Sequence, residues 1–73
     1  MTENRPLDAL DQAKGSRIII TLKNDDVITG ILKAFDLHLN VWLENAERRS
    51  DSKTVKLGTV VIRGDNILLA SPE

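Results

Sequence analysis

Apolar and polar side chains alternate along residues 17–23. Ile18, Ile20 and Leu22 fall on one side of an extended segment, and the residues between them fall on the other. A period of two predicts a β-strand with one buried face. Residues 23–26 follow, and their Asn and Asp content predicts a turn. A second strand is predicted over residues 27–36.

Three more strands are predicted in the second half of the chain. They cover residues 39–46, 54–63 and 67–70. They are separated by a polar variable loop at residues 48–53 and a tight turn at residues 64–66. Gly30, in the middle of the second predicted strand, indicates a bend or a close backbone approach, as expected where a sheet curls toward a barrel. This pattern favours an all-β fold, a small and strongly bent five-stranded antiparallel barrel.

Residues 6–14 are predicted to form an N-terminal α-helix. Pro6 suits the first helical position, because its fixed φ and missing N–H cost nothing there, and apolar residues recur after it at helical spacing. A helix of about nine residues is too short to be stable alone, so Leu7 and Leu10 are expected to pack on the sheet. Residues 1–5 are polar and are expected to be flexible.

Size and composition exclude several classes of protein. At 73 residues and 8.1 kDa the chain is too short for a multidomain enzyme with a cleft between lobes, so residues 1–73 are expected to form one domain. The chain has no Cys and a single His, which excludes disulfides, thiolate zinc sites and His-rich metal sites, and no cofactor is expected. A chain this small buries only about 60% of its unfolded surface, so oligomerisation is the expected source of further stability.

Charge and hydropathy limit the kinds of partner. Ten basic and eleven acidic residues give a net charge of −1, which argues against a broad cationic face for duplex nucleic acid, so any nucleic-acid site must be local. The N-terminus lacks the apolar segment of a secretory signal, and no run approaches the roughly 20 apolar residues that span a bilayer. A cytoplasmic protein without membrane contact is expected.

The alternation fails in two apolar runs, at residues 60–62 and 67–69. A strand at the edge of a sheet normally keeps one solvated face, but both faces of these segments are apolar. Two explanations remain open. The helix could cover one side of the sheet, or these strands could pair with a neighbouring subunit.

Polar residues at two predicted turns could form a binding site. Asp36, His38 and Asn40 are spaced by two, which puts them on one side of an extended chain, and Arg63 and Asp65 repeat that spacing. Each of these residues alone is most simply a solvated or capping side chain. Together, the imidazole and guanidinium planes could sandwich a flat heterocycle while the carboxamide bonds its edge. Catalysis is rejected, because the sequence supplies neither a third metal ligand nor an activated nucleophile.

The same residues carry a resemblance to a known family. Residues 30–41 contain an Asp-x-His-x-Asn pattern and resemble the first Sm motif, and residues 57–67 contain Ile-Arg-Gly-Asp and resemble the second. Residues 5–8 are similar to the start of an archaeal Sm-like protein, so the resemblance to the Sm/LSm family covers residues 5–72. It implies a helix on a five-stranded bent barrel, assembled into a homo-oligomeric ring, usually of seven, by pairing of the fourth strand with the fifth strand of the next subunit. The two motif regions then cover residues 17–47 and 54–71, on either side of the variable loop.

The resemblance also implies a function. Sm-like rings bind single-stranded, uridine-rich RNA at the inner rim of the pore, and they act in RNA processing with other proteins, as ribonucleoprotein cores or as RNA chaperones. Carried onto this sequence, His38 and Arg63 would sandwich the base, Asn40 would bond its edge, and Gly64 and Asp65 would complete the pocket. A structural ring or protein-interaction scaffold, with incidental RNA binding, remains the alternative.

Other residues near these motifs are open to interpretation. A freely rotating Asn40 amide would accept cytosine as well as uracil, so we expect Asp36, or a backbone group in its loop, to fix the amide orientation. Arg48 and Arg49 could extend RNA contact from the variable loop, although a solvated loop charge is the simpler interpretation. The only aromatic residues, Phe35 and Trp42, are expected in the core or at an interface.

Overall fold

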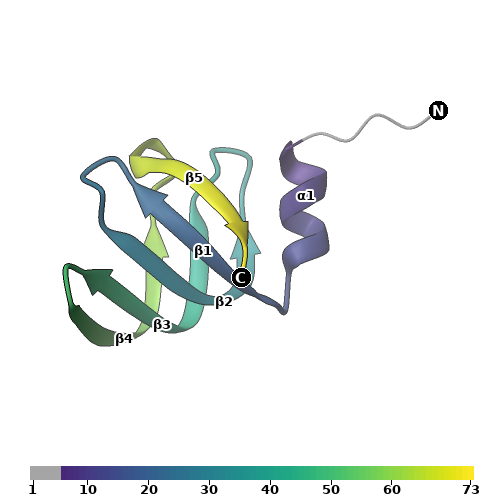
Figure 1. Cartoon of the computed structure of the whole chain (residues 1–73). Helices are drawn as coiled ribbons and strands as arrows, with labels where there is room; N and C mark the ends of the chain where they lie inside the picture. Colours follow the sequence, from purple (N-terminus) through teal and green to yellow (C-terminus); the bar gives the residue numbers. More distant parts are fainter. Residues whose placement is uncertain (1–5) are drawn as a thin grey trace.

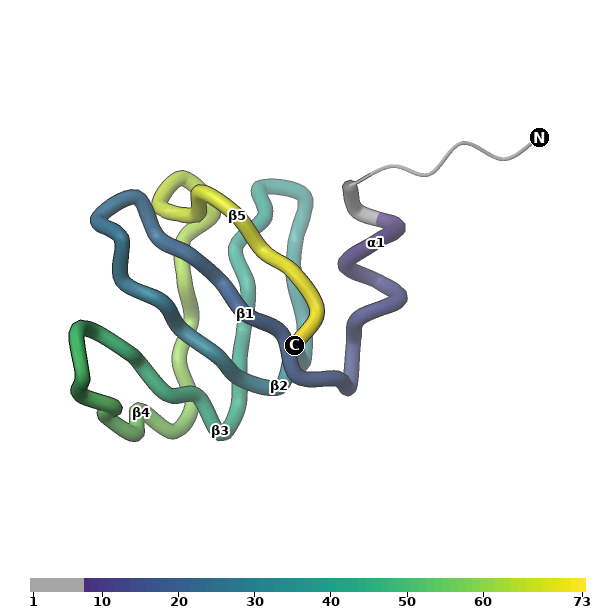
Figure 2. Tube along the Cα trace, in the orientation of Figure 1, coloured from purple at the N-terminus to yellow at the C-terminus, as the bar shows by residue number. Residues whose placement is uncertain are grey.

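The computed structural model describes residues 6–73, which form one helix and one antiparallel sheet (Figure 1). The elements are α1 (Pro6–Ala13), β1 (Arg17–Leu22), β2 (Val27–Phe35), β3 (Val41–Ser50), β4 (Lys53–Ile62) and β5 (Ile67–Pro72), with one 3-10 turn at Gly64–Asn66. The strand order is β4-β3-β2-β1-β5, and the tube in Figure 2 shows the sheet curling so that β5 crosses near the start of β3 and the end of β4. The predicted helix and bent five-stranded sheet are confirmed, whereas the flexibility expected for residues 1–5 lies outside the described residues.

The core lies on one face of the curled sheet. Ile18 and Ile20, which the alternation placed on the buried side of β1, are 2% and 0% exposed. The remaining buried apolar side chains are Ile28, Leu32, Val41, Leu43, Ala46 and Ile62. From α1, Leu10 and Ala13 pack against this cluster, as the helical spacing predicted for Leu10, whereas the contact expected for Leu7 lies outside the described side chains.

Gly30 lies where β2 and β3 approach each other closely. A Cβ atom at this position would lie 3.1 Å from Leu43 Cβ and 3.2 Å from the Glu44 carbonyl oxygen. The β2–β3 register also shifts between Thr29 and Ile31. An irregular register bends the strand that carries it, so the expected bend and close approach at Gly30 are confirmed.

The variable loop predicted at residues 48–53 is wrong. β3 continues to Ser50 and β4 begins at Lys53, which leaves only Asp51 and Ser52 in the turn. The prediction failed because it assumed that a run of polar residues, here 48–53, forms a loop. Polar residues are accepted in a strand when their side chains find partners, and Arg48 Nε lies 3.2 Å from Asp26 Oδ2.

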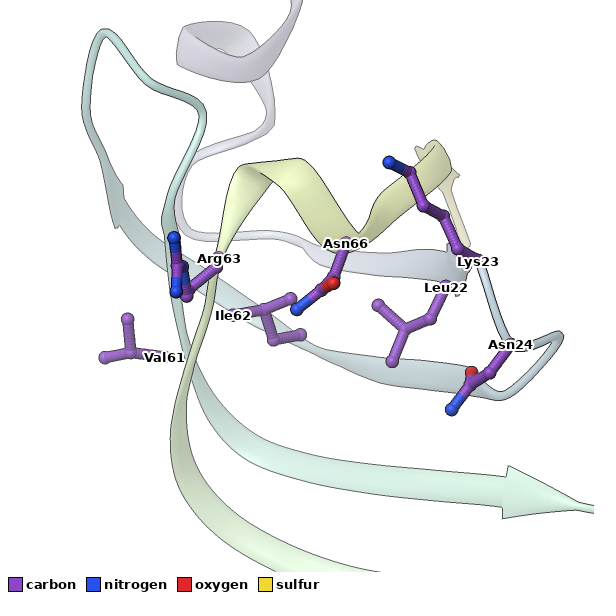
Figure 3. Close-up of a pocket in the computed structure, with 7 residues that line it drawn as sticks. All are labelled: Leu22, Lys23, Asn24, Val61, Ile62, Arg63 and Asn66. Atoms are coloured by element: carbon purple, nitrogen blue, oxygen red, sulfur yellow. The ribbon is translucent and has the colours of Figure 1, made fainter.

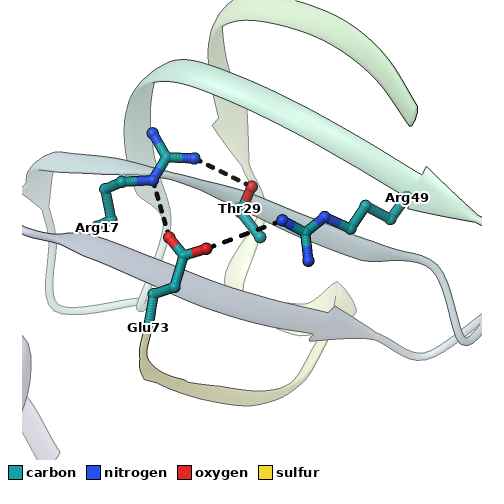
Figure 4. A network of polar contacts seen from close by, with 4 residues as sticks. All are labelled: Arg17, Thr29, Arg49 and Glu73. Atoms are coloured by element: carbon teal, nitrogen blue, oxygen red, sulfur yellow. Dashed lines mark hydrogen bonds and ion pairs between the residues drawn. The ribbon is translucent and has the colours of Figure 1, made fainter.

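Arg49 belongs to a polar network that ties three strands to Glu73 (Figure 4). The Glu73 carboxylate accepts a hydrogen bond of 2.8 Å from Arg17 Nε and lies 3.8 Å from an Arg49 nitrogen. Arg17 also donates to the hydroxyl of the fully buried Thr29 at 3.3 Å. Arg48 and Arg49 are therefore paired strand residues, not the solvated loop charges that we expected.

Two strands of the sheet, β4 and β5, have unpaired edges. Val61 on β4 is 70% exposed, and Leu68 and Leu69 on β5 are 65% and 59% exposed. α1 therefore does not cover these three side chains, and the first of the two explanations for the apolar runs fails for them. All of β5 and the second half of β4, after Lys56, carry exposed apolar residues and no charge, and an edge of this kind is prone to pair with another strand.

Candidate nucleic-acid interface

The loop between β2 and β3 is organised by the carboxylate of Asp36. Its Oδ1 atom accepts hydrogen bonds from the backbone N–H groups of His38, at 2.9 Å, and Asn40, at 3.0 Å. Leu39 N–H bonds the Asp36 carbonyl oxygen at 3.0 Å, and Leu39 adopts a φ of 63° to allow the turn. Aspartate is favoured at the start of turns because its side chain can accept from the backbone a few residues later. The loop is thus held in one conformation by a single side chain.

The Asn40 amide joins this loop to the turn after β4. Asn40 Nδ2 donates to Asp36 Oδ2 at 3.0 Å, and Asn40 Oδ1 accepts from the backbone N–H of Gly64 at 2.9 Å. These partners allow only one orientation of the amide, because a flip would place the amide NH₂ against the Gly64 N–H and the amide oxygen against the carboxylate. The geometry is consistent with the expectation for Asp36, whereas the backbone partner belongs to the turn after β4 and not to the Asp36 loop.

Gly64 lies against the backbone of the β2–β3 loop. A Cβ atom here would overlap the His38 carbonyl oxygen and would lie 2.8 Å from both the carbonyl carbon and the carbonyl oxygen of Leu39. Close backbone contact is what allows the Gly64 N–H to reach Asn40. Glycine is therefore required here for space.

The hydrogen bonds at Asp36 also stabilise its charged form. The Asn40 side chain is the main cause that lowers the pKa of Asp36 below its ordinary value. The backbone N–H groups of Asn40 and His38 and the charge of His38 act in the same direction, and partial desolvation opposes them. Because the folded-state pKa is depressed, the contribution of these bonds is complete above the pKa of an unfolded aspartate and is lost as the pH falls through the lower folded value. The loop is thus organised throughout the neutral range.

The remaining predicted site residues surround this bonded centre. Arg63 and Asp65 flank Gly64 and pair with each other at 3.2 Å, with side chains 77% and 63% exposed. An ion pair this exposed is weak, so the Arg63 guanidinium is available to a ligand. His38 is held through its backbone, and its exposed imidazole makes no hydrogen bond or ion pair with any residue that the structure describes.

One pocket beside Arg63, with both polar and apolar walls, was not predicted from the sequence (Figure 3). It has a volume of about 400 Å³, and Lys23, Asn24 and Asn66 line it together with Arg63. From the sequence, Lys23 and Asn24 are predicted only to be turn residues. Nothing in their spacing indicates that the turn after β1 meets the turn after β4.

Residues 6–73 contain no cluster of three or more His, Asp or Glu side chains able to hold a metal ion, and no helix among them is both long and apolar enough to cross a bilayer.

Comparison with known proteins defines the family. A family model described as the LSM domain matches residues 8–72. The chain belongs to the LSM family. It is 44% identical over 70 residues to a protein of Methanococcoides burtonii described as snRNP Sm-like, with 94% of this chain and 97% of the relative covered. The resemblance found in the two sequence motifs is therefore confirmed.

Solved structures of Sm proteins share the fold of this LSM chain. The SmAP1 heptamer of P. aerophilum superposes with a TM-score of 0.92 at 36% identity, covering 99% of this chain and 97% of the other. The Pyrococcus abyssi Sm protein, solved in complex with a uridine heptamer, superposes with a TM-score of 0.90 at 41% identity, covering 96% of this chain and 100% of the other. Among similar proteins, one thus forms a heptamer and another binds uridine oligomers.

Proposed function

We propose that this LSM chain forms a closed ring of seven identical subunits, which binds single-stranded, uridine-rich RNA at the inner rim of its pore. The observation that carries the proposal is the fixed Asn40 amide between Asp36 and Gly64. The heptamer of one relative and the uridine complex of another support it. The function is binding and not catalysis, and it serves RNA processing, a ribonucleoprotein core or RNA chaperoning in the cytoplasm.

The hydrogen-bonding groups of Asn40 that remain unused match uracil. A carboxamide has two N–H donors and two oxygen lone pairs, and the bonds to Asp36 and Gly64 use one of each. Uracil presents a carbonyl acceptor beside an N–H donor on its pairing edge, whereas cytosine presents the two in the opposite order. With the base held by stacking and the ribose by the path of the strand, an amide that cannot flip selects uracil.

Stacking supplies the affinity that the amide does not. The exposed His38 imidazole and Arg63 guanidinium offer two flat faces, and the backbone of His38 contacts Gly64, the residue next to Arg63. Base stacking contributes about 1–3 kcal/mol per base, so a single pocket binds weakly. Pockets repeated around a ring bind successive bases at high effective concentration, which raises the affinity without any new type of contact.

The two free sheet edges support assembly. Val61 is exposed near the end of β4, and Leu68 and Leu69 are exposed near the start of β5, so the β4 edge of one subunit and the β5 edge of the next would bury these three side chains together. Closure of the ring would also gather the copies of Arg63 around one opening, although each chain carries a net charge of −1. A locally positive rim is thus compatible with an overall acidic protein.

Arg63→Ala is expected to abolish most binding to oligo-uridine while the ring stays intact, because it removes one face of the base sandwich. Native mass spectrometry with oligo-uridine and oligo-adenosine measures subunit number, occupancy and base preference together. Lys14→Ala, which removes one positive charge at an exposed position near the end of α1, is the control and is expected to bind normally. If Arg63→Ala binds oligo-uridine as well as the unmodified ring does, the scaffold alternative replaces the RNA-binding proposal.

Asp36→Ala is expected to weaken the preference for oligo-uridine over oligo-cytidine, because the Asn40 amide loses the acceptor that orients it. Asp11→Ala, at an exposed helical carboxylate, is the control. In the unmodified protein the preference is expected to persist as the pH falls into the range where an ordinary aspartate takes up a proton, since the lowered pKa keeps Asp36 ionised there. Competition binding with the two oligonucleotides measures the ratio, and an unchanged ratio in Asp36→Ala would show that Asp36 does not set base choice.

A further inference from the structure

The pocket in Figure 3 lies outside the set of residues that contact the base in the proposed function. Arg63 forms part of its wall, so the pocket and the proposed base site share one side chain. An RNA strand that stacks a base on Arg63 has its sugar and phosphates close to this residue. The pocket therefore lies within reach of the sugar and phosphates next to that base.

The walls of the pocket are well ordered by hydrogen bonds. The Lys23 N–H donates to the Asn66 carbonyl oxygen at 2.9 Å, and this bond ties the turn after β1 to the turn after β4. Asn24 Oδ1 accepts from the Asp26 N–H at 3.0 Å, which holds the first turn, and the Asn66 N–H donates to the Arg63 carbonyl oxygen at 3.0 Å, which holds the second. A cavity between two braced turns is largely formed before any ligand arrives.

Two polar side chains in the wall are available to bind a ligand. The Lys23 ammonium and the Asn66 amide make no hydrogen bond or ion pair with any side chain in the part of the chain that the structure describes, whereas Asn24 is occupied by Asp26. The floor is apolar and consists of Leu22, Val61 and Ile62. Val61 also lies on the β4 edge that the proposed ring covers, so Leu22 and Ile62 form the part of the floor outside that contact. Figure 3 shows the Asn66 amide directed over Ile62 and Lys23 at the rim.

The charged side chains that line the pocket, Lys23 and Arg63, are both positive. Asp26 is paired with Arg48, and neither Asp26 nor Asp65 lines the pocket. Asp25 belongs to the same turn as Lys23 but does not line the pocket. One free ammonium, one free amide and an apolar floor suit a ribose with its adjoining phosphate better than a multiply charged anion, which would need several cations.

We propose that this pocket binds the sugar–phosphate backbone of the RNA strand. Lys23 contacts a phosphate and Asn66 bonds a ribose 2′-hydroxyl, while the carbon face of the ribose rests on the apolar floor. The inference rests on the proposed function, since it places the backbone of the strand whose bases are read by Asn40. Because the 2′-hydroxyl distinguishes RNA from DNA, Asn66 is the residue that sets this preference.

The phosphate contact is tested by the salt dependence of binding to oligo-uridine. Lys23→Ala is expected to lower affinity equally for all sequences and to reduce the slope of log affinity against log salt by about 0.7 for each phosphate that Lys23 neutralises. Lys14→Ala removes the same charge at an exposed site near the end of α1 and is expected to leave the slope unchanged. A slope in Lys23→Ala equal to that of the unmodified ring would overturn the phosphate contact.

The ribose contact is tested with two ligands that carry the same base, oligo-uridine and oligo-deoxyuridine. The unmodified ring is expected to prefer the ribose form, and Asn66→Ala is expected to lose this preference, whereas Gln12→Ala, at an exposed amide of α1, keeps it. A preference that Asn66→Ala retains would overturn the ribose contact while leaving the proposed function in place. If the unmodified ring binds neither ligand, the proposed function fails and the subsite fails with it. Native mass spectrometry of each variant confirms that the ring has formed.

Discussion

Replacing Gly64 with alanine is expected to abolish binding of oligo-uridine and to destabilise the fold by about 1–3 kcal/mol, the usual cost of forcing extra volume into a packed site. The added methyl group would overlap the His38 carbonyl oxygen, and the Leu39 backbone would have to move as well. The turn after β4 would then separate from the β2–β3 loop, and the Gly64 N–H would no longer reach Asn40. The base sandwich and the orientation of the Asn40 amide would be lost together, because both depend on the contact between Gly64 and the β2–β3 loop.

Loss of stability and loss of binding can be separated with a second glycine. Gly58 has a φ of 75° and nothing within 4 Å of the Cβ position, so Gly58→Ala is strained in its backbone but does not collide with any neighbour. A residue forced into the left-handed region costs about 1–2 kcal/mol, a loss comparable to that expected of Gly64→Ala. Gly58→Ala is expected to lower the midpoint of thermal unfolding and to bind oligo-uridine normally. Normal binding by Gly64→Ala in the same titration would show that the contact between the two loops is not needed.

Local patterns in the sequence were sufficient to predict the elements that bury apolar side chains. Ile18 and Ile20 alternate with outward residues and are buried, and Gly30 falls where β2 and β3 touch. The end of β3 was missed because Arg48 and Arg49 are polar, and their acceptors, Asp26 and Glu73, come from distant positions in the sequence. Strand boundaries that depend on such partners cannot be found from periodicity.

In the candidate site, too, contacts between residues close in the sequence could be predicted, whereas contacts between distant residues could not. The spacing of Asp36 and Asn40 indicated that their side chains could meet, because that contact spans four residues. The bond from Gly64 to Asn40 spans 24 residues and depends on how two turns approach each other in the folded barrel. The hydrogen bond from Lys23 to Asn66, beside the pocket proposed for the RNA backbone, also joins two turns that are far apart in the sequence. The family resemblance put Asn40 and Gly64 in one pocket but did not give the bond between them, and only the structure supplied the Lys23–Asn66 contact.

Leu69→Lys is expected to dissociate the ring and to lower the affinity for oligo-uridine by at least about a hundredfold, the range that multivalent binding contributes. Leu69 is 59% exposed on β5, at the edge that the proposed ring pairs with β4 of the next subunit. Lysine at a strand edge is a common means of preventing edge-to-edge pairing. The added positive charge would by itself favour RNA, so a loss of affinity cannot be attributed to repulsion of phosphates.

Trp42 reports assembly independently of RNA. It is the only Trp, there is no Tyr, and its side chain is 44% exposed in the single chain. Its cross-strand neighbour is Val61 on the open edge of β4, so a strand added to that edge would lie within reach of the large indole and shield it from water. The ring is expected to fluoresce at shorter wavelength than the Leu69→Lys protein, whereas Gln12→Lys, which adds the same charge on α1, should match the ring. If Leu69→Lys stays a heptamer by native mass spectrometry, the β5 edge is not the interface; if it is a monomer that still binds oligo-uridine tightly, affinity does not come from repetition of the pocket.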